Sequence, residues 1–134
     1  MHTLSSIQQQ FTTLFPGLMG MELLEAAAQR VVAAMKVRPD LCTTGGVLHG
    51  GALMAFADTL GAVGTFMNLA EGARTTTIDS STKFIGAAPA GSTVRGECVP
   101  FHRGRTTMVW QTVVKSEAGK ICGVVTQTQL ILYP

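Results

Sequence analysis

The sequence is most informative at Gly45-Gly46-Val47-Leu48-His49-Gly50-Gly51, a glycine-rich turn that runs directly into an apolar segment over residues 52–69. A turn of this kind before such a segment predicts a helix whose first backbone N–H groups are free. The helix dipole makes those groups good partners for negative charge that develops on an oxygen atom. Asp58 lies two turns into the segment, between Phe56 and Leu60. An unpaired buried carboxylate is costly, so this position indicates a functional residue rather than a packing residue.

The first half of the chain predicts mainly helix. Ser5 and Ser6 can cap a short helix over about residues 5–15, which Pro16-Gly17 ends. The segment over residues 22–36 leaves two interpretations open, because its alanines favour a helix while its β-branched residues favour a strand. The apolar segment predicts one long helix, roughly over residues 47–69.

The second half of the chain predicts an antiparallel sheet. Four segments rich in β-branched residues are separated by turns that contain glycine or proline, and they cover residues 75–85, 93–101, 106–116 and 121–132. We expect these segments to be sequential antiparallel strands. One long helix packed on one antiparallel sheet is an α+β architecture.

The composition fits a single domain over residues 1–134, a length that suffices for a modest core. The chain is 46% hydrophobic and only 13% charged, so we expect part of its apolar surface to be buried between subunits. A net charge of +2, without a run of Lys or Arg interleaved with aromatic residues, argues against nucleic-acid binding.

The thiol and imidazole groups are scattered along the sequence, at Cys42, Cys98, Cys122, His2, His49 and His102. The cysteines form no C-x-x-C pair and are odd in number, so we expect reduced thiols rather than a disulfide framework. The histidines lack the spacing of a metal site, and we expect neither a metal nor another cofactor. The N-terminus has no basic region followed by a long apolar core, and Asp58 interrupts the longest apolar run. These features predict a cytoplasmic protein that does not interact with a membrane.

Several motifs together resemble one known family. They are Val47-Leu48-His49-Gly50-Gly51 with Asp58 nine positions after His49, Thr77-Ile78-Asp79, and Phe84-Ile85-Gly86-Ala87-Ala88-Pro89-Ala90-Gly91. From about Gly20 to the C-terminus the chain resembles the hotdog-fold acyl-CoA thioesterases of the phenylacetate-catabolism (PaaI-like) type. The resemblance implies a strongly curved antiparallel sheet around one central helix, with a β-hairpin over residues 22–37. It also implies that two subunits form one continuous sheet and that such homodimers pair into a homotetramer.

The resemblance further implies hydrolysis of a fatty or aromatic acyl-CoA to the free acid and CoA, at a site between two subunits. Asp58 then acts as general base on water or as nucleophile. The Gly51 backbone N–H polarises the thioester carbonyl. His49 hydrogen-bonds the loop or the substrate carbonyl, and the partner subunit directs the Thr77 hydroxyl toward the water. Loop shaping explains His49 equally well, and Thr77 is equally well an ordinary strand residue.

Five further residues are candidates for substrate binding: Gly50, Thr43, Lys83, Arg103 and Arg105. Gly50 belongs to the motif at the start of the helix. Thr43 stands six positions before the motif histidine, where many relatives carry Asn or Gln. A hydroxyl does not reach as far as an amide, so the substrate class stays open. Lys83 and the turn that contains both arginines are candidates for the CoA phosphates, although basic turns are usually only solvated.

Four apolar residues are candidates to line an acyl tunnel, or else belong to the core: Met54, Phe56, Met67 and Phe84. Two other functions are alternatives to hydrolysis. Hydratases and dehydratases of the same fold act on enoyl or hydroxyacyl thioesters, but the Asp-x-x-x-x-His arrangement that one such group carries on its helix is missing from this sequence. A non-catalytic acyl-CoA-binding protein has no need of Asp58.

Overall fold

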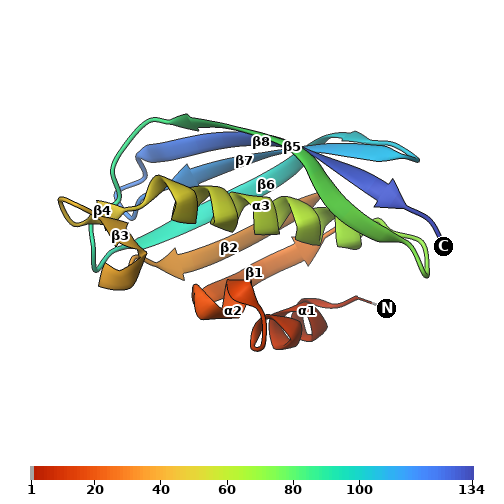
Figure 1. Ribbon diagram of the computed structural model, residues 1–134, viewed down its shortest axis with the longest axis horizontal. Coiled ribbons are helices and arrows are strands. Elements are labelled where there is room, and N and C mark those ends of the chain that lie inside the picture. Colours follow the sequence, from red (N-terminus) through yellow and green to blue (C-terminus); the bar gives the residue numbers. More distant parts are fainter. Residues whose placement is uncertain (1) are drawn as a thin grey trace.

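A six-stranded antiparallel sheet curves around one long helix in the computed structural model, which describes residues 2–134 (Figure 1). The elements are α1 (Leu4–Phe11), α2 (Phe15–Leu18), β1 (Met21–Ala27), β2 (Arg30–Lys36), the 3-10 helix η1 (Pro39–Leu41), β3 (Cys42–Thr43), β4 (Val47–Leu48), α3 (Gly50–Phe66), β5 (Arg74–Phe84), β6 (Thr93–Arg103), β7 (Thr107–Lys115) and β8 (Ile121–Leu132). The strand order is β1-β2-β6-β7-β8-β5, and β3 and β4 form a separate two-stranded sheet. This α+β arrangement is a hotdog fold, which confirms the architecture that the resemblance implies.

β5 lies at an edge of the sheet rather than beside β6. It pairs with β8, whereas β6 pairs with β2 and β7. The expectation of four sequential strands is therefore right for β6, β7 and β8 and wrong for β5. The connection from β5 to β6 is anchored outside the sheet, since Leu48 N–H donates to Ala88 O and Ala90 N–H donates to Gly46 O, each at 2.8 Å. A connection held in this way carries the chain across the sheet instead of closing a tight hairpin.

β1 and β2 form the antiparallel hairpin that the resemblance implies for this part of the chain. Intrinsic propensity does not decide between helix and strand here, because the alanines of the segment favour a helix. The burial pattern decides in favour of a strand, since Val31, Ala33 and Met35 occupy alternate positions of β2 and all belong to the core. Packing on one face of a sheet therefore overrides the helical preference of the alanines.

The N-terminal segment forms two short helices instead of one helix over residues 5–15. Thr3 is the N-cap of α1 and forms a capping box with Ser6, and α1 already ends at Phe11. Pro16 lies in the first turn of α2, where its missing N–H leaves no hydrogen bond unmade. Pro16 and Gly17 are thus part of a helix, and the expectation that they end one is wrong.

α1 covers the outer edge of β1. Gln8 Nε2 donates to Met21 O at 3.1 Å, and Leu23 N–H donates to Gln8 Oε1 at 2.7 Å, so this side chain takes the place of a neighbouring strand. β5, at the other edge, has 11 residues, and no strand within residues 2–134 pairs with its outer side. An uncovered strand of this length is a natural edge for pairing with another chain.

α3 begins at Gly50 and ends at Phe66, so it is shorter than the helix over residues 47–69 that the sequence predicts. The residues before it form β4, which pairs with β3 across a turn. Gly45 and Gly46 in this turn have φ angles of 88° and 72°, a conformation that favours glycine. The turn reverses the chain into β4, and α3 begins after this short strand, with His49 as its N-cap.

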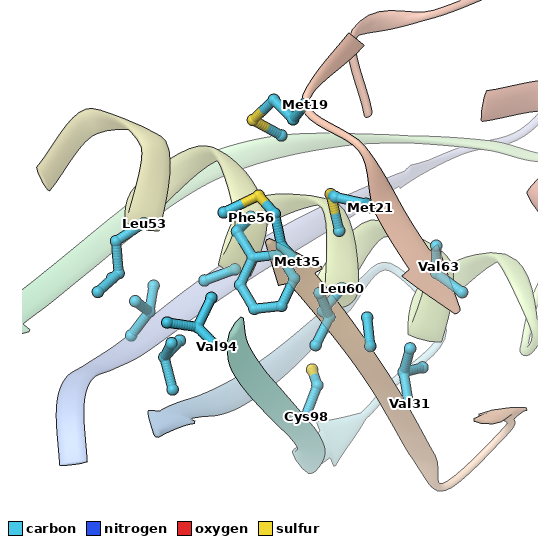
Figure 2. Close-up of a cluster of buried hydrophobic side chains, with 14 of the residues drawn as sticks. Met19, Met21, Val31, Met35, Leu53, Phe56, Leu60, Val63, Val94 and Cys98 are labelled. Carbon is cyan, nitrogen blue, oxygen red and sulfur yellow. The ribbon is translucent and has the colours of Figure 1, made fainter. Parts of the chain in front are cut away.

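The core lies between α3 and the face of the sheet that curves around it (Figure 2). Leu53, Phe56, Leu60 and Val63 project from α3 at helical spacing, and they pack with residues of β2 and β6 that include Val31, Met35, Val94 and Cys98. Full burial of a side chain of this size contributes about 1.5–3 kcal/mol. Phe56 is completely buried, so it belongs to the core and not to an acyl tunnel.

Candidate active site

Asp58 is half-buried on the side of α3 that faces β5 and β8. Thr77 Oγ1, from β5, donates a hydrogen bond of 2.6 Å to Asp58 Oδ1. Gln127 Nε2, from β8, lies 3.3 Å from the same oxygen and 3.1 Å from the Asp58 backbone O. One carboxylate oxygen is therefore held by two donors from the sheet, which leaves Oδ2 as the oxygen available for chemistry.

A chain of hydrogen bonds continues from Thr77 into the sheet. Gln129 Nε2 donates to Thr77 Oγ1 at 2.6 Å, and Thr75 Oγ1 donates to Gln129 Oε1 at 2.9 Å. Because the Thr77 oxygen accepts from Gln129, its single proton points to Asp58. The resemblance implies that Thr77 is directed across the subunit interface toward water, whereas within this chain its hydroxyl contacts its own Asp58.

Sequence analysis missed Gln127 and Gln129, which are both completely buried. They lie on the helix-facing side of β8, in a row with Val125 and Ile131. Two glutamines at alternate positions, in line with the apolar Val125 and Ile131, are the signal that could have identified them. Gln127 Oε1 has no hydrogen-bond partner within residues 2–134. A buried amide that is only partly satisfied is a stability cost, which points to a positioning role for Gln127.

A β-bulge lies next to Thr77. Thr77 pairs with Gln129 and Asp79 pairs with Thr128, so Ile78 is the extra residue. The bulge leaves Thr77 opposite Gln129, on the helix-facing side, and turns Ile78 outward, where it is 56% exposed. Bulges re-aim side chains and are common beside active sites.

His49 is the N-cap of α3, and its ring shapes the first turn. His49 Nδ1 accepts a hydrogen bond of 2.8 Å from Gly51 N–H, while His49 O accepts from Ala52 N–H and Leu53 N–H. The neutral ring therefore carries its proton on Nε2, which is left as a donor. Gly50 N–H is the one donor of this turn without an acceptor in the described part of the chain. The predicted oxyanion donor, Gly51 N–H, is thus engaged by His49.

The predicted substrate-binding residues lie in different regions of one chain. Thr43 is exposed in β3, near the tip of the hairpin that precedes α3. Lys83 is exposed on β5, directly before Phe84, whose ring packs against Gly50. Arg103 and Arg105 lie beside Leu69 and Ala70, at the opposite end of α3. Within one chain Lys83 lies one residue before Phe84 on β5, whereas both arginines lie at the far end of α3.

Two grooves flank the start of α3. One, of about 400 Å³, is lined by residues that include Gly50, Leu53, Phe84 and Ala88. The other, of about 410 Å³, is lined by residues of α2, η1 and the first turn of α3. Met54 and Met67, the other two candidates for an acyl tunnel, line neither groove.

The buried cysteines are not nucleophiles of this site. Burial raises the pKa of the Cys98 thiol to about 12 and also raises the pKa of Cys122, so both stay protonated at neutral pH. Within residues 2–134 no group of three or more His, Cys, Asp and Glu side chains is arranged to hold a metal ion. None of the helices in that range combines the length and the hydropathy needed to cross a bilayer.

A curved antiparallel sheet around one helix, with a carboxylate held on that helix and a histidine at its start, defines the class of hotdog thioesterases. Comparison with known families agrees with this class, since residues 45–123 match the thioesterase superfamily. The chain belongs to this family and is a thioester hydrolase.

Individual relatives support the same class. The chain is 32% identical over 104 residues to the proofreading thioesterase EntH of Cronobacter turicensis, a match that covers 78% of this chain and 75% of that one. The crystal structure of a Haemophilus influenzae thioesterase superimposes with a TM-score of 0.92 at 26% identity and covers 99% of this chain and 92% of its own. The fold is also that of smu.793 from Streptococcus mutans, solved with acetyl-CoA bound, at a TM-score of 0.78, 19% identity, and coverage of 84% of this chain and 89% of that one.

Proposed function

We propose that the protein hydrolyses an acyl-CoA thioester to the free acid and CoA, with Asp58 as the reacting carboxylate. The observation that carries the proposal is the pair of donors on Asp58 Oδ1, from Thr77 and Gln127, which orient the carboxylate and leave Oδ2 free. A carboxylate oriented in this way, with one oxygen free, can accept a proton from water. The acetyl-CoA held by smu.793 supports CoA thioesters as the substrate type.

In the proposed reaction Asp58 Oδ2 takes a proton from water while the water oxygen attacks the thioester carbonyl carbon. The carbonyl oxygen becomes an oxyanion, which collapses as the C–S bond breaks, and the CoA sulfur leaves and is protonated. Positioned proton transfer of this kind contributes about 10²–10⁴-fold to the rate. In the variant mechanism Asp58 attacks the carbonyl carbon, the C–S bond breaks and CoA leaves, and water then hydrolyses the resulting anhydride. Label in Asp58 after a single turnover in ¹⁸O-labelled water identifies this pathway, because the general-base pathway places the label only in the acid product.

The start of α3 is the proposed oxyanion site. Gly50 N–H and His49 Nε2–H are the donors that the geometry leaves free, and Gly51 N–H joins them when the substrate oxygen replaces His49 Nδ1 as its acceptor. One donor of this kind is typically worth about 10²–10³ in turnover. This assignment keeps the Gly51 and His49 roles that the family resemblance implies and adds Gly50.

Two subunits are proposed to complete each site. Asp58 lies seven residues after Gly51, which is a rise of about 10 Å along α3. The general base and the oxyanion donors must both lie within about 3 Å of atoms of one small group. Pairing of the uncovered β5 edges of two subunits places the start of one α3 beside the Asp58 region of the other. We therefore propose a homodimer with shared sites, and pairing of dimers into a tetramer.

The same antiparallel pairing unites the basic residues. Lys83 lies near the end of β5, and Arg103 and Arg105 lie at the opposite end of the sheet. A two-fold axis through β5 brings these opposite ends of two subunits to the same side. The three residues are proposed to bind the CoA phosphates together, since Arg and Lys are the usual ligands of phosphate.

Thiol release from a panel of acyl-CoAs, measured for wild type beside Asp58→Asn, tests the proposal. The panel runs from acetyl to palmitoyl and includes phenylacetyl and hydroxybenzoyl thioesters. We expect turnover with a fatty or aromatic substrate that falls by at least about 10²-fold in a folded Asp58→Asn dimer. Hydration of an enoyl-CoA without thiol release, or ligand-induced stabilisation without turnover, would contradict it. Near-normal hydrolysis by Asp58→Asn would remove Asp58 from the mechanism.

A further inference from the structure

The catalytic steps proposed above assign no part of the substrate to the groove between α2 and the start of α3. It encloses about 410 Å³ and is walled by apolar side chains, Phe15 and Leu18 from α2, Leu41 from η1 and Ala52 from α3. His49 and Gly51 line its inner end, which places that end at the proposed oxyanion site. A group that enters this groove is therefore attached close to the thioester carbonyl.

α2 is held in place as a wall of the groove. Phe15 and Leu18 are 57% and 70% exposed, although α2 has only four residues and contributes no buried residue. Arg38 Nη2 donates to Leu18 O at 2.8 Å, and Arg38 Nε pairs with Asp40 Oδ1 at 3.0 Å. α2 lies before residue 45, where the match to the thioesterase superfamily begins. Exposed apolar residues on a tethered segment next to the reaction site point to an apolar ligand.

The two grooves at the helix start differ in their lining. The groove beside Gly50 is lined by uncharged residues, and Lys83, which precedes Phe84 on β5, is exposed but does not line it. In the groove beside α2, Arg38 and Asp40 neutralise each other, so its outer end offers no net charge for a phosphate or a carboxylate. Of the two grooves, the one beside α2 is lined by both His49 and Gly51, which favours it as the site of the acyl group.

We propose that the groove between α2 and α3 binds the acyl group of the substrate and that α2 determines which acyl groups are accepted. The proposal rests on the acyl-CoA thioesterase function. A methylene group occupies about as much space as a water molecule in the liquid, about 30 Å³, so the groove takes on the order of ten carbon atoms. The substrate class is an uncharged, medium-length or aromatic acyl thioester, and acetyl leaves the groove empty.

The ratio of kcat/KM for decanoyl-CoA to kcat/KM for acetyl-CoA tests the proposal. Leu18→Ala removes apolar wall from α2, and Ala52→Leu fills the groove from the opposite side. Because one methylene in an apolar pocket is worth about 10-fold or more, we expect each variant to lower the ratio at least tenfold. Leu14→Ala is the matched control, since Leu14 is 56% exposed, directly precedes α2 and does not line the groove. Its ratio should equal that of wild type.

The outcomes separate this inference from the proposed function. If wild type hydrolyses acyl-CoAs through Asp58 but the ratio is unchanged in both variants, the acyl group binds elsewhere and the inference is wrong. If the ratio falls equally in Leu14→Ala, α2 has only a structural role and the inference is also wrong. If wild type releases no thiol from any acyl-CoA, the proposed function itself fails. Leu18 is mostly exposed, so its replacement tests binding rather than folding.

Discussion

Thr77 Oγ1 and Asp58 Oδ1 lie 2.6 Å apart within one chain and join the edge strand β5 to the central helix α3. Thr77 Oγ1 accepts a hydrogen bond from Gln129, so its own proton is directed to Asp58. The strand that is free to pair with another subunit thus also orients the proposed catalytic carboxylate. In the proposed dimer, β5 would therefore link assembly to catalysis.

Replacement of Thr77 by valine should lower kcat by about 10- to 100-fold. A hydrogen bond to a charged group contributes about 1.5–3 kcal/mol, and valine has nearly the same shape but no hydroxyl. Thr77→Ser, which keeps the donor, should retain most of the activity. Steady-state kinetics of both variants check this, and equal activity of Thr77→Val and wild type would show that Asp58 does not need this donor.

Gln127→Leu should lower activity without lowering stability. The variant removes the Nε2 donor from Asp58, but it also removes Oε1, which is buried and without a partner within residues 2–134. Replacing a half-satisfied buried amide by an apolar group of similar size is close to neutral for stability. Urea unfolding together with kcat measures both effects, and a large loss of stability would assign Gln127 to the core instead of the site.

Gly61→Ala should disturb the site more than Gly64→Ala does. A Cβ at Gly61 would lie 2.3–2.5 Å from the Gln127 carboxamide atoms, whereas a Cβ at Gly64 would lie 2.7–2.9 Å from the Trp110 ring. Both variants overpack the helix–sheet contact, which typically costs about 1–3 kcal/mol. Only Gly61→Ala displaces a group bound to Asp58, so kcat should fall in this variant and stay near wild type in folded Gly64→Ala.

Mixed dimers test whether two subunits share each site. If Asp58 of one subunit works with the partner's His49, a dimer of one Asp58→Asn subunit and one His49→Ala subunit has one intact site and one doubly altered site. Such a dimer, purified with two different tags, should recover about half of the wild-type activity if the two sites act independently. If each site lies within one chain, every site carries one lesion, and the mixed dimer stays as inactive as its parents.

Alkaline pH should destabilise the wild type more than Cys98→Ala. Burial raises the pKa of Cys98 from 9.0 to about 12, so between these values the unfolded chain loses a proton that the folded chain keeps. The stability that the protonated Cys98 contributes is complete below pH 9. It is lost as the pH rises, by at most about 1.4 kcal/mol per pH unit. Free energies of unfolding in urea from neutral pH to about pH 10.5 should show the steeper decline in wild type. Parallel declines in both proteins would contradict the assignment.

Local patterns in the sequence were sufficient for several elements. The helical spacing of Leu53, Phe56 and Leu60 and the glycine-rich turn before them predict α3, and β-branched segments predict β6, β7 and β8. Asp58 also stands out locally, because a carboxylate among apolar residues is costly wherever the helix packs. The helix starts at Gly50 and not at residue 47, because Val47 and Leu48 pair with β3 as the second strand of a hairpin.

Other features depend on which segments lie opposite each other, and no local pattern contains that information. The β1–β2 hairpin competes with a helical propensity and is resolved by burial against α3. The edge position of β5, the buried Gln127 and Gln129 behind Asp58, and the engagement of Gly51 N–H by His49 all arise from contacts over long sequence distances or from the cap conformation. Periodicity along one segment identifies the face that is buried, whereas the partner that a polar group meets on that face is determined only when the sheet closes around the helix.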